Sequence, residues 1–263
     1  MAEPASAPST AEPPSNWMTF PCELDDGPAP KAAVGLIALA SDLTSEPELR
    51  SFLPRDGVAL YANRIPMPKE ATVEALRQLE ANITRTVAGL VPDNHLDVIA
   101  FGCTSGAMAI GKDRVAAHIR AAKPAIPCTD PISAGLKGLR ALGCRRIAVL
   151  TPYVDEVNAV VEAYIGAQDF EVAVKGSFKQ AGDPEMCRIP PSAIHQAGLE
   201  LGRADVDGLF ISCTALRVSP ILERLEQALG KPVVSSNQAL AWDCLRLAGC
   251  NEQVPGYGRL LMT

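Results

Sequence analysis

Two cysteines lie in matching sequence contexts and have the chemistry for proton transfer. Residues 97–104 read Asp-Val-Ile-Ala-Phe-Gly-Cys-Thr, and residues 207–214 read Asp-Gly-Leu-Phe-Ile-Ser-Cys-Thr. In both copies an Asp opens an apolar run typical of a buried strand, and a small residue followed by Cys-Thr ends it. Ligands of open α/β sheets bind beside the carboxyl ends of the strands. We therefore predict that Cys103 and Cys213 face one cleft and act as a pair of proton carriers.

Polar residues follow each cysteine. Cys103 precedes Thr104 and Ser105 at the start of a predicted helix, where hydroxyls, unpaired backbone N–H groups and the helix dipole favour an anion. Cys213 precedes Thr214, and the Arg three residues later adds a positive charge. Such surroundings can hold a carboxylate and lower the pKa of a thiol. The structural alternatives stay open, since a free Cys is often a small buried hydrophobic residue and Thr or Ser often caps a helix.

The composition excludes several classes of protein. The 263 residues are 48% hydrophobic and 21% charged, which is enough for one large domain or two smaller ones. The net charge of −6 offers no basic footprint for nucleic acid, and no apolar run reaches the roughly 18 residues that span a membrane. Without a secretory signal we expect a cytoplasmic protein with free cysteines. The three histidines are scattered and no C-x2-C pair occurs, so we predict no metal site.

Short apolar runs alternate with longer amphipathic stretches, which predicts parallel sheets covered by helices. Strands are predicted at residues 34–40, 58–61, 98–103, 147–151, 170–174, 208–213 and 232–235. Helices are predicted at residues 69–90, 107–122, 132–142, 155–166, 191–204, 220–229 and 238–247. The repeated phrase then divides the chain into a disordered tail (1–31), a first α/β lobe (32–129 plus 235–263) and a second α/β lobe (130–234).

Four motifs in order resemble the Asp/Glu racemase superfamily. They lie at residues 102–106 (Gly-Cys-Thr-Ser-Gly), 151–158 (Thr-Pro-Tyr-Val-Asp-Glu-Val-Asn), 212–214 (Ser-Cys-Thr) and 255–260 (Pro-Gly-Tyr-Gly-Arg-Leu). The chain most resembles the branch of maleate cis-trans isomerases, arylmalonate decarboxylases and racemase-like ectoine-utilisation proteins, over about residues 33–263. The resemblance implies two flavodoxin-like parallel-sheet lobes related by a pseudo-twofold axis, an active site in the cleft between them and no cofactor. Members often pair, which makes a homodimer the default expectation.

The resemblance also assigns roles to individual residues. Cys103 and Cys213 match the two catalytic thiols, whereas arylmalonate decarboxylases keep only the second and have Gly at the first, which argues against a decarboxylase. Four further residues are assigned to substrate binding. Thr104 and Ser105 match donors to a substrate carboxylate, and Tyr153 matches a tyrosine that hydrogen-bonds to it. Thr214 would add donors beside the second thiol. A Tyr after a Pro can also simply pack at a loop.

Asp42 stands where maleate isomerases carry an Asn that binds a substrate carboxylate. An ionised Asp would repel a second carboxylate by about 4 kcal/mol at about 4 Å under an effective dielectric near 20, and it would attract an ammonium. We therefore expect Asp42 to bind the amino group of a substrate with one carboxylate. With equal weight, Asp42 caps the helix predicted to follow near Ser45. The phrases at residues 39–44 and 64–67 resemble the ectoine-utilisation members, which are thought to act on 2,4-diaminobutyrate or its N-acetyl derivatives.

We predict a cofactor-independent isomerase acting on a small carboxylate, with racemisation of an amino acid derivative as the first hypothesis. One Cys as thiolate would remove a proton from one face of the carbon, and the other Cys as thiol would return a proton to the opposite face. The first alternative is a maleate cis-trans isomerase in which one Cys adds to the double bond. An arylmalonate-type decarboxylase, a non-catalytic carboxylate sensor and a redox-sensing dithiol are the further alternatives.

Overall fold

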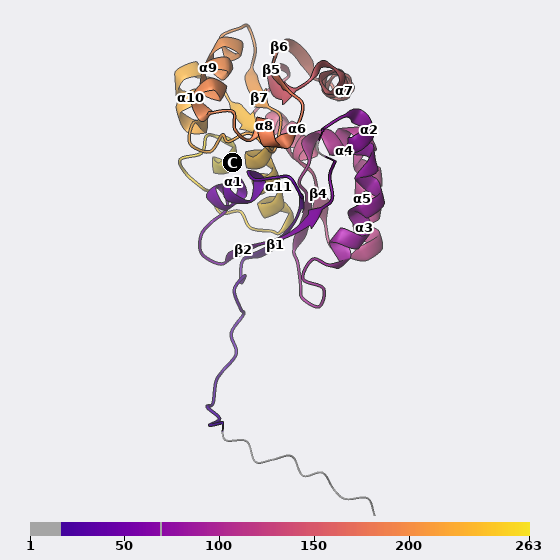
Figure 1. The fold of residues 1–263 in the computed structure, drawn as a ribbon. Helices are drawn as coiled ribbons and strands as arrows, with labels where there is room; N and C mark the ends of the chain where they lie inside the picture. Colours follow the sequence, from indigo (N-terminus) through magenta and orange to yellow (C-terminus); the bar gives the residue numbers. More distant parts are fainter. Residues whose placement is uncertain (1–16, 69) are drawn as a thin grey trace, which may run out of the picture.

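The computed structural model describes residues 17–68 and 70–263, and its regular elements form two parallel four-stranded sheets (Figure 1). The first sheet has the order β2-β1-β3-β4, from β1 (Ala32–Leu39), β2 (Val58–Ile65), β3 (Val98–Phe101) and β4 (Cys128–Thr129). The second has the order β6-β5-β7-β8, from β5 (Arg146–Tyr153), β6 (Glu171–Gln180), β7 (Gly208–Ile211) and β8 (Val233–Ser235). The identical order confirms the predicted α/β fold with two similar lobes.

The strands are apolar because helices cover both faces of a parallel sheet. All eight residues of β1 are buried, as are all four of β3 and of β7. β3 and β7 therefore run through the centres of their sheets, and each delivers a Cys-Thr pair at its carboxyl end.

The Asp that opens each repeated phrase ties the thiol-bearing strand to its neighbour. The Asp97 carboxylate accepts the Ala33 N–H of β1 at 2.7 Å. In the second lobe, the Asp207 carboxylate accepts the N–H groups of Arg145 and Arg146 at 2.8 and 2.7 Å, where β5 begins. The same residue type thus makes the same kind of contact in both halves.

The helices follow the predicted alternation, with local differences. They are α1 (Ser45–Phe52), α2 (Val73–Gln78), α3 (Glu80–Ala88), α4 (Thr104–Ile110), α5 (Lys112–Ala122), α6 (Pro131–Ala141), α7 (Asp155–Gly166), α8 (Asp183–Met186), α9 (Pro191–Gly202), α10 (Leu222–Leu229) and α11 (Ser236–Leu247), with a 3₁₀ turn at Leu260–Met262. The single helix predicted over 107–122 is divided at Gly111, whose φ of 99° a right-handed helix cannot continue. α4 therefore starts immediately after Cys103.

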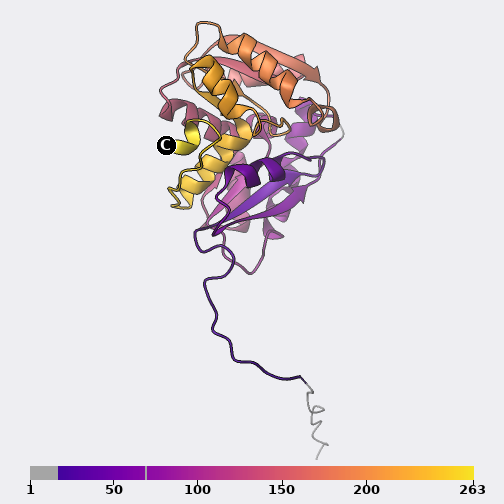
Figure 2. The same cartoon turned by 90° about the vertical axis from the view of Figure 1, so that its left-hand side faces the viewer.

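The last long helix joins the two halves of the fold. α11 follows β8 of the second sheet, yet it packs against α1, β3 and β4 as well as against α6 (Figure 2). It thus returns the chain to the first sheet. The predicted lobe boundaries stay predictions. Of the predicted tail, residues 1–16 lie outside the described residues, and residues 17–31 contain no helix or strand.

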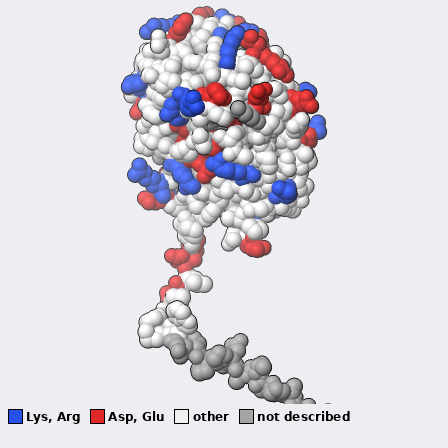
Figure 3. Space-filling model, in the orientation of Figure 1, with Lys and Arg blue, Asp and Glu red and all other residues white. Residues whose placement is uncertain are grey.

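The surface carries charges of both signs. On the face shown in Figure 3, basic and acidic side chains are interspersed over the two lobes. Within residues 17–68 and 70–263, no helix combines the length and the apolarity of a membrane span. All eight cysteines are free thiols, and Cys103 and Cys213 are among the buried ones.

Candidate active site

The two thiols of the repeated phrase border one cavity. Cys103 follows β3 and caps the N-terminus of α4, while Cys213 follows β7. Four further residues predicted for the site also line this cavity: Thr104, Ser105, Tyr153 and Thr214. The apolar part of the wall comes from Leu39, Met67, Ala71 and Leu76. The structure thus brings together residues from both lobes that lie up to about two thirds of the chain apart.

Each sulfur accepts a hydrogen bond from a backbone amide just downstream. The Gly106 N–H donates to Cys103 Sγ at 3.3 Å, and the Ala215 N–H donates to Cys213 Sγ at 3.3 Å. A Cβ atom at residue 106 would lie 2.9 Å from the Cys103 sulfur, so the close approach requires glycine. Because such donors stabilise a thiolate more than a thiol, both sulfurs are placed to carry negative charge during a reaction.

In the closed site, burial keeps both thiols protonated. Burial raises the pKa of Cys103 to about 12, and the Asp183 carboxylate also raises it. The Gly106 N–H and the Ser105 hydroxyl act in the opposite direction and lower it. Burial also raises the pKa of Cys213, opposed chiefly by the Tyr153 phenol. A thiolate at either position would require the site to open or a bound group to offset the burial.

Tyr153 links the two thiol motifs. Its phenol hydrogen-bonds to Cys213 of the second lobe and to Ser105 of the first, and burial raises its pKa so that it stays a protonated donor. Its backbone carbonyl accepts Ser177 Oγ at 2.5 Å and Asn158 Nδ2 at 2.8 Å. Two side chains of the second lobe thus fix the end of β5 that carries the phenol.

The start of α11 holds both threonines, a contact that the sequence analysis did not assign. Thr104 Oγ1 donates to Ser236 Oγ at 3.0 Å, and Asn237 Nδ2 donates to the Thr214 carbonyl at 2.9 Å. Thr214 Oγ1 donates across to the Gly102 carbonyl at 3.3 Å. The available signal was the polar run at residues 235–238, directly after a buried strand next to β7.

Asp42 is placed differently from the predicted substrate contact. Its carboxylate accepts the N–H groups of Thr44 and Ser45 at 2.6 and 2.9 Å and the Ser45 hydroxyl, at the start of α1. It does not line the thiol cavity, so the helix-capping alternative describes its contacts. Arg217 is also turned away, being exposed and donating to the Ile189 carbonyl at 3.1 Å.

The carboxylate that does line the cavity belongs to Asp183, which the sequence analysis did not select. Asp183 opens the short helix α8 of the second lobe and accepts Ser41 Oγ of the first lobe at 2.5 Å. Burial raises its pKa, and the neighbouring Asp42 raises it further, against the Ser41 hydrogen bond. Its residue range, Gly-Asp-Pro-Glu, reads as an ordinary turn.

The cavity is closed in this structure. Its volume is about 10 Å³, which is room for about one water molecule. Besides the Ser41–Asp183 bond, the Ala71 N–H donates across to the Ala181 carbonyl at 2.9 Å. Any ligand larger than a water molecule would need these contacts between the lobes to separate before it could enter.

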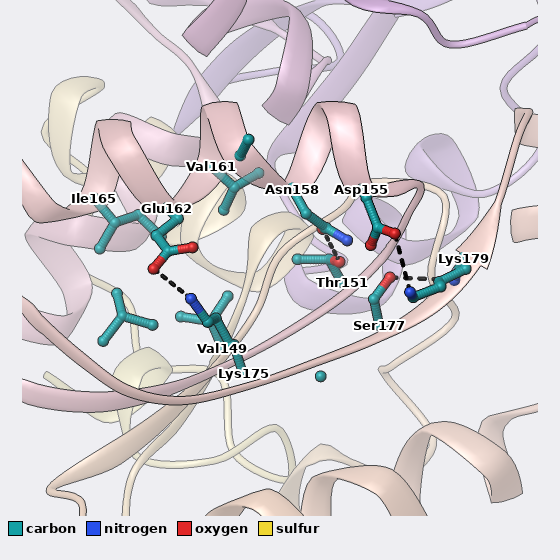
Figure 4. A pocket seen from close by; sticks show the side chains of 13 residues that line it. Val149, Thr151, Asp155, Asn158, Val161, Glu162, Ile165, Lys175, Ser177 and Lys179 are labelled. Carbon is teal, nitrogen blue, oxygen red and sulfur yellow. Dashed lines mark hydrogen bonds and ion pairs between the residues drawn. The ribbon is translucent and has the colours of Figure 1, made fainter.

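A larger cavity of about 360 Å³ lies between α7 and β6 (Figure 4). Ion pairs of Lys175 with Glu162 and of Lys179 with Asp155 cross it, and none of the described residues that line it is a cysteine. Asn158, whose side chain also donates to the Tyr153 carbonyl at the end of β5, lines this cavity and accepts a hydrogen bond from Thr151 Oγ1 at 2.5 Å. Among the described residues, no group of three or more His, Cys, Asp or Glu side chains is arranged to hold a metal ion.

The two sheets and the facing thiols define a two-lobed α/β protein of the Asp/Glu racemase-like superfamily. A profile of the family named arylmalonate decarboxylase matches residues 53–261. The chain therefore belongs to the family of arylmalonate decarboxylases and maleate isomerases, which confirms the predicted family. The finer resemblance to ectoine-utilisation proteins stays a prediction.

Two relatives illustrate the range of this family. The maleate isomerase of Nocardia farcinica is 30% identical over 238 residues, 87% of this chain and 94% of that enzyme. The arylmalonate decarboxylase of Bordetella bronchiseptica is 38% identical over 138 residues, 51% of this chain and 58% of that enzyme. Among solved structures, a cysteine-to-serine mutant of the Nocardia farcinica maleate cis-trans isomerase with a covalently bound succinylcysteine intermediate superposes with a TM-score of 0.80 at 28% identity, covering 88% of this chain and 98% of that one.

Proposed function

We propose that this chain is a cofactor-independent isomerase that exchanges a proton at the carbon next to a carboxylate, using Cys103 and Cys213 as the two proton carriers. The observation that carries the proposal is that both thiols line one cavity, each with a backbone N–H directed at its sulfur. Two carriers are needed because inversion at carbon requires a base on one face and an acid on the other.

The proton transfers of this reaction balance without a cofactor. One thiolate takes the proton from carbon, and the electron pair of the C–H bond passes into the adjacent carboxylate as an enediolate. The second thiol then gives its proton to the opposite face of the same carbon and becomes the thiolate. The enzyme is reset when the two sulfurs exchange one proton with water.

The developing enediolate needs hydrogen-bond donors in a water-poor site. Ser105 and Tyr153 present hydroxyls to the cavity beside the two thiols, and Thr104 and Thr214 border it. The hydroxyls of these two threonines are engaged between the lobes while the site is closed. Opening of the lobes frees them for a substrate carboxylate.

The substrate that we propose is a small amino acid derivative with one carboxylate, of the type of 2,4-diaminobutyrate or its N-acetyl forms. A carboxylate, not a basic side chain, stands among the described residues that line the cavity, and Lys, Arg and His are absent from that lining. The motif resemblance to ectoine-utilisation proteins supports the same class of substrate.

Maleate cis-trans isomerisation is the second candidate function, favoured by the similarity to maleate isomerases over 87% of the chain. In that reaction one thiolate adds to the double bond, the C–C bond rotates, and the thiolate leaves again as the bond re-forms. The proton that enters carbon during addition is returned on elimination. The Asp183 carboxylate in the wall is the feature that speaks against a dicarboxylate.

Incubation in deuterium oxide with a panel of compounds separates the candidates. The panel contains maleate, aspartate, 2,4-diaminobutyrate and its Nα- and Nγ-acetyl forms, followed by proton NMR. We expect loss of the α-proton signal of a diaminobutyrate compound, and fumarate formation from maleate would favour the second candidate. If none of the five exchanges or isomerises with wild-type protein that is folded, the proposed function is wrong.

A further inference from the structure

Asp183 gives the thiol cavity its charge. The described residues of the lining comprise two thiols, four hydroxyl side chains, four apolar side chains and this one carboxyl group. Ser41 Oγ donates one hydrogen bond to it, which leaves further acceptor capacity on a carboxylate with about four lone-pair sites.

The Asp183 carboxylate lines the same small cavity as the two sulfurs. Its charge acts on both sulfurs, since it raises the pKa of Cys103 and of Cys213. The reacting carbon of the proposed function must lie between those sulfurs. A substrate group that meets Asp183 is therefore attached to that carbon or to its neighbour.

We propose that Asp183 binds a cationic nitrogen on or next to the reacting carbon, and that this pairing cancels the negative charge that opposes thiolate formation. The inference rests on the proposed function for the identity of the reacting carbon. The nitrogen stays protonated throughout, and the proton that a thiol releases on substrate binding passes to water. Substrate binding itself thus prepares the base.

The pairing discriminates between related compounds. A free α-ammonium can reach Asp183, whereas an Nα-acetyl group removes the positive charge from the same atom. The Nγ-acetyl form of diaminobutyrate keeps its α-ammonium and should bind. A dicarboxylate of the same length instead meets a like charge.

Calorimetric binding tests this assignment without requiring turnover. The ligands are 2,4-diaminobutyrate and succinate, which has two carboxylates and no nitrogen, and the proteins are wild type, Asp183→Asn and Asp42→Asn. Asn keeps an oxygen acceptor for Ser41 Oγ at residue 183 and, at residue 42, for the Thr44 and Ser45 N–H groups. Thermal melting confirms that each variant is folded.

Wild type should prefer diaminobutyrate over succinate, and Asp183→Asn should reduce that preference by roughly tenfold or more, because the negative charge that attracts an ammonium and repels a carboxylate is lost. Asp42→Asn should keep the wild-type order. Addition of diaminobutyrate should also raise the ultraviolet absorbance of thiolate in wild type and not in Asp183→Asn. The assignment is overturned if wild type binds succinate as well as diaminobutyrate, if neither ligand binds, or if Asp42→Asn causes the change.

Failure of this inference is distinguishable from failure of the proposed function. If wild type exchanges deuterium and Asp183→Asn keeps the wild-type ligand preference, the proposed role of Asp183 is wrong and the two-thiol reaction is unaffected. An Asp183-dependent preference without any exchange leaves the binding assignment standing and removes the reaction.

Discussion

Glu48 on α1 fastens the first lobe to the second, and its removal should weaken the whole fold. The buried carboxylate accepts the Val218 N–H at 3.0 Å, the Ser219 N–H at 3.0 Å and the Ser219 hydroxyl at 2.7 Å. These acceptor contacts join residues that lie 170 and 171 positions apart in the chain. They also fix the loop that follows Cys213.

The size of the effect follows from the groups left without a partner. In Glu48→Ala the buried Val218 N–H and the half-buried Ser219 N–H lose their acceptor, at about 1–3 kcal/mol for a buried group and less for the half-buried one. Burial raises the pKa of Glu48, which shows that the buried carboxylate carries a desolvation cost in the wild type. This cost offsets part of the stability that its hydrogen bonds contribute. We expect a net loss of about 2–4 kcal/mol, or roughly 5–15 °C in Tm for a chain of this size.

Thermal and urea unfolding of Glu48→Ala measure this loss, with Glu46→Ala as the matched control. Glu46 lies on the same helix and pairs with the exposed Arg64, so its removal should change stability by less than about 1 kcal/mol. Equal stability of the two variants would refute the reasoning, because it would mean that the contact between the lobes contributes no more than a surface ion pair.

Two further perturbations follow from single side chains. Tyr153→Phe removes the hydroxyl that lowers the pKa of Cys213 against burial. The proposed isomerase activity near neutral pH should therefore fall by roughly 10-fold to 100-fold, and the pH-activity curve should move to higher pH. Tyr164→Phe, which changes a half-buried side chain of α7 outside the lining of the thiol cavity, should change neither. The backbone N–H groups of Arg146 and Arg145 lower the pKa of Asp207 in the folded protein. The ionised Asp207 carboxylate therefore stabilises the fold above about pH 4, and this contribution is lost as the pH falls through the lowered pKa. The stability difference between wild type and Asp207→Ala should therefore shrink between neutral and strongly acidic pH in denaturant titrations, and a constant difference would contradict the role of the carboxylate.

The fold was predictable because buried parallel strands have a strong local signature. The runs at β3 and β7 are apolar throughout and end in the same Cys-Thr pair, so both the strands and their equivalence could be recognised. Short elements escaped detection. β4 has two residues and α8 has four, and neither was predicted.

The site was predictable only where sequence neighbours define it. Cys103, Ser105 and Tyr153 lie in motifs that can be recognised along the chain, and they meet in the cavity. Asp183 was missed because its position depends on a contact with Ser41, 142 residues away, between the lobes. Such long-range contacts carry no local pattern, and the roles of the matched residues stay predictions until tested.

Isotope transfer during a single conversion tests the two-thiol reaction most directly. The compound of the panel that exchanges is supplied as one enantiomer in deuterium oxide, and the α-position of remaining substrate and of product is followed early in the reaction. Two carriers on opposite faces predict that product carries deuterium while remaining substrate keeps protium, and that Cys103→Ser and Cys213→Ser each stop product formation. Product that retains the original protium, or product formed at the wild-type rate by either variant, would contradict the account.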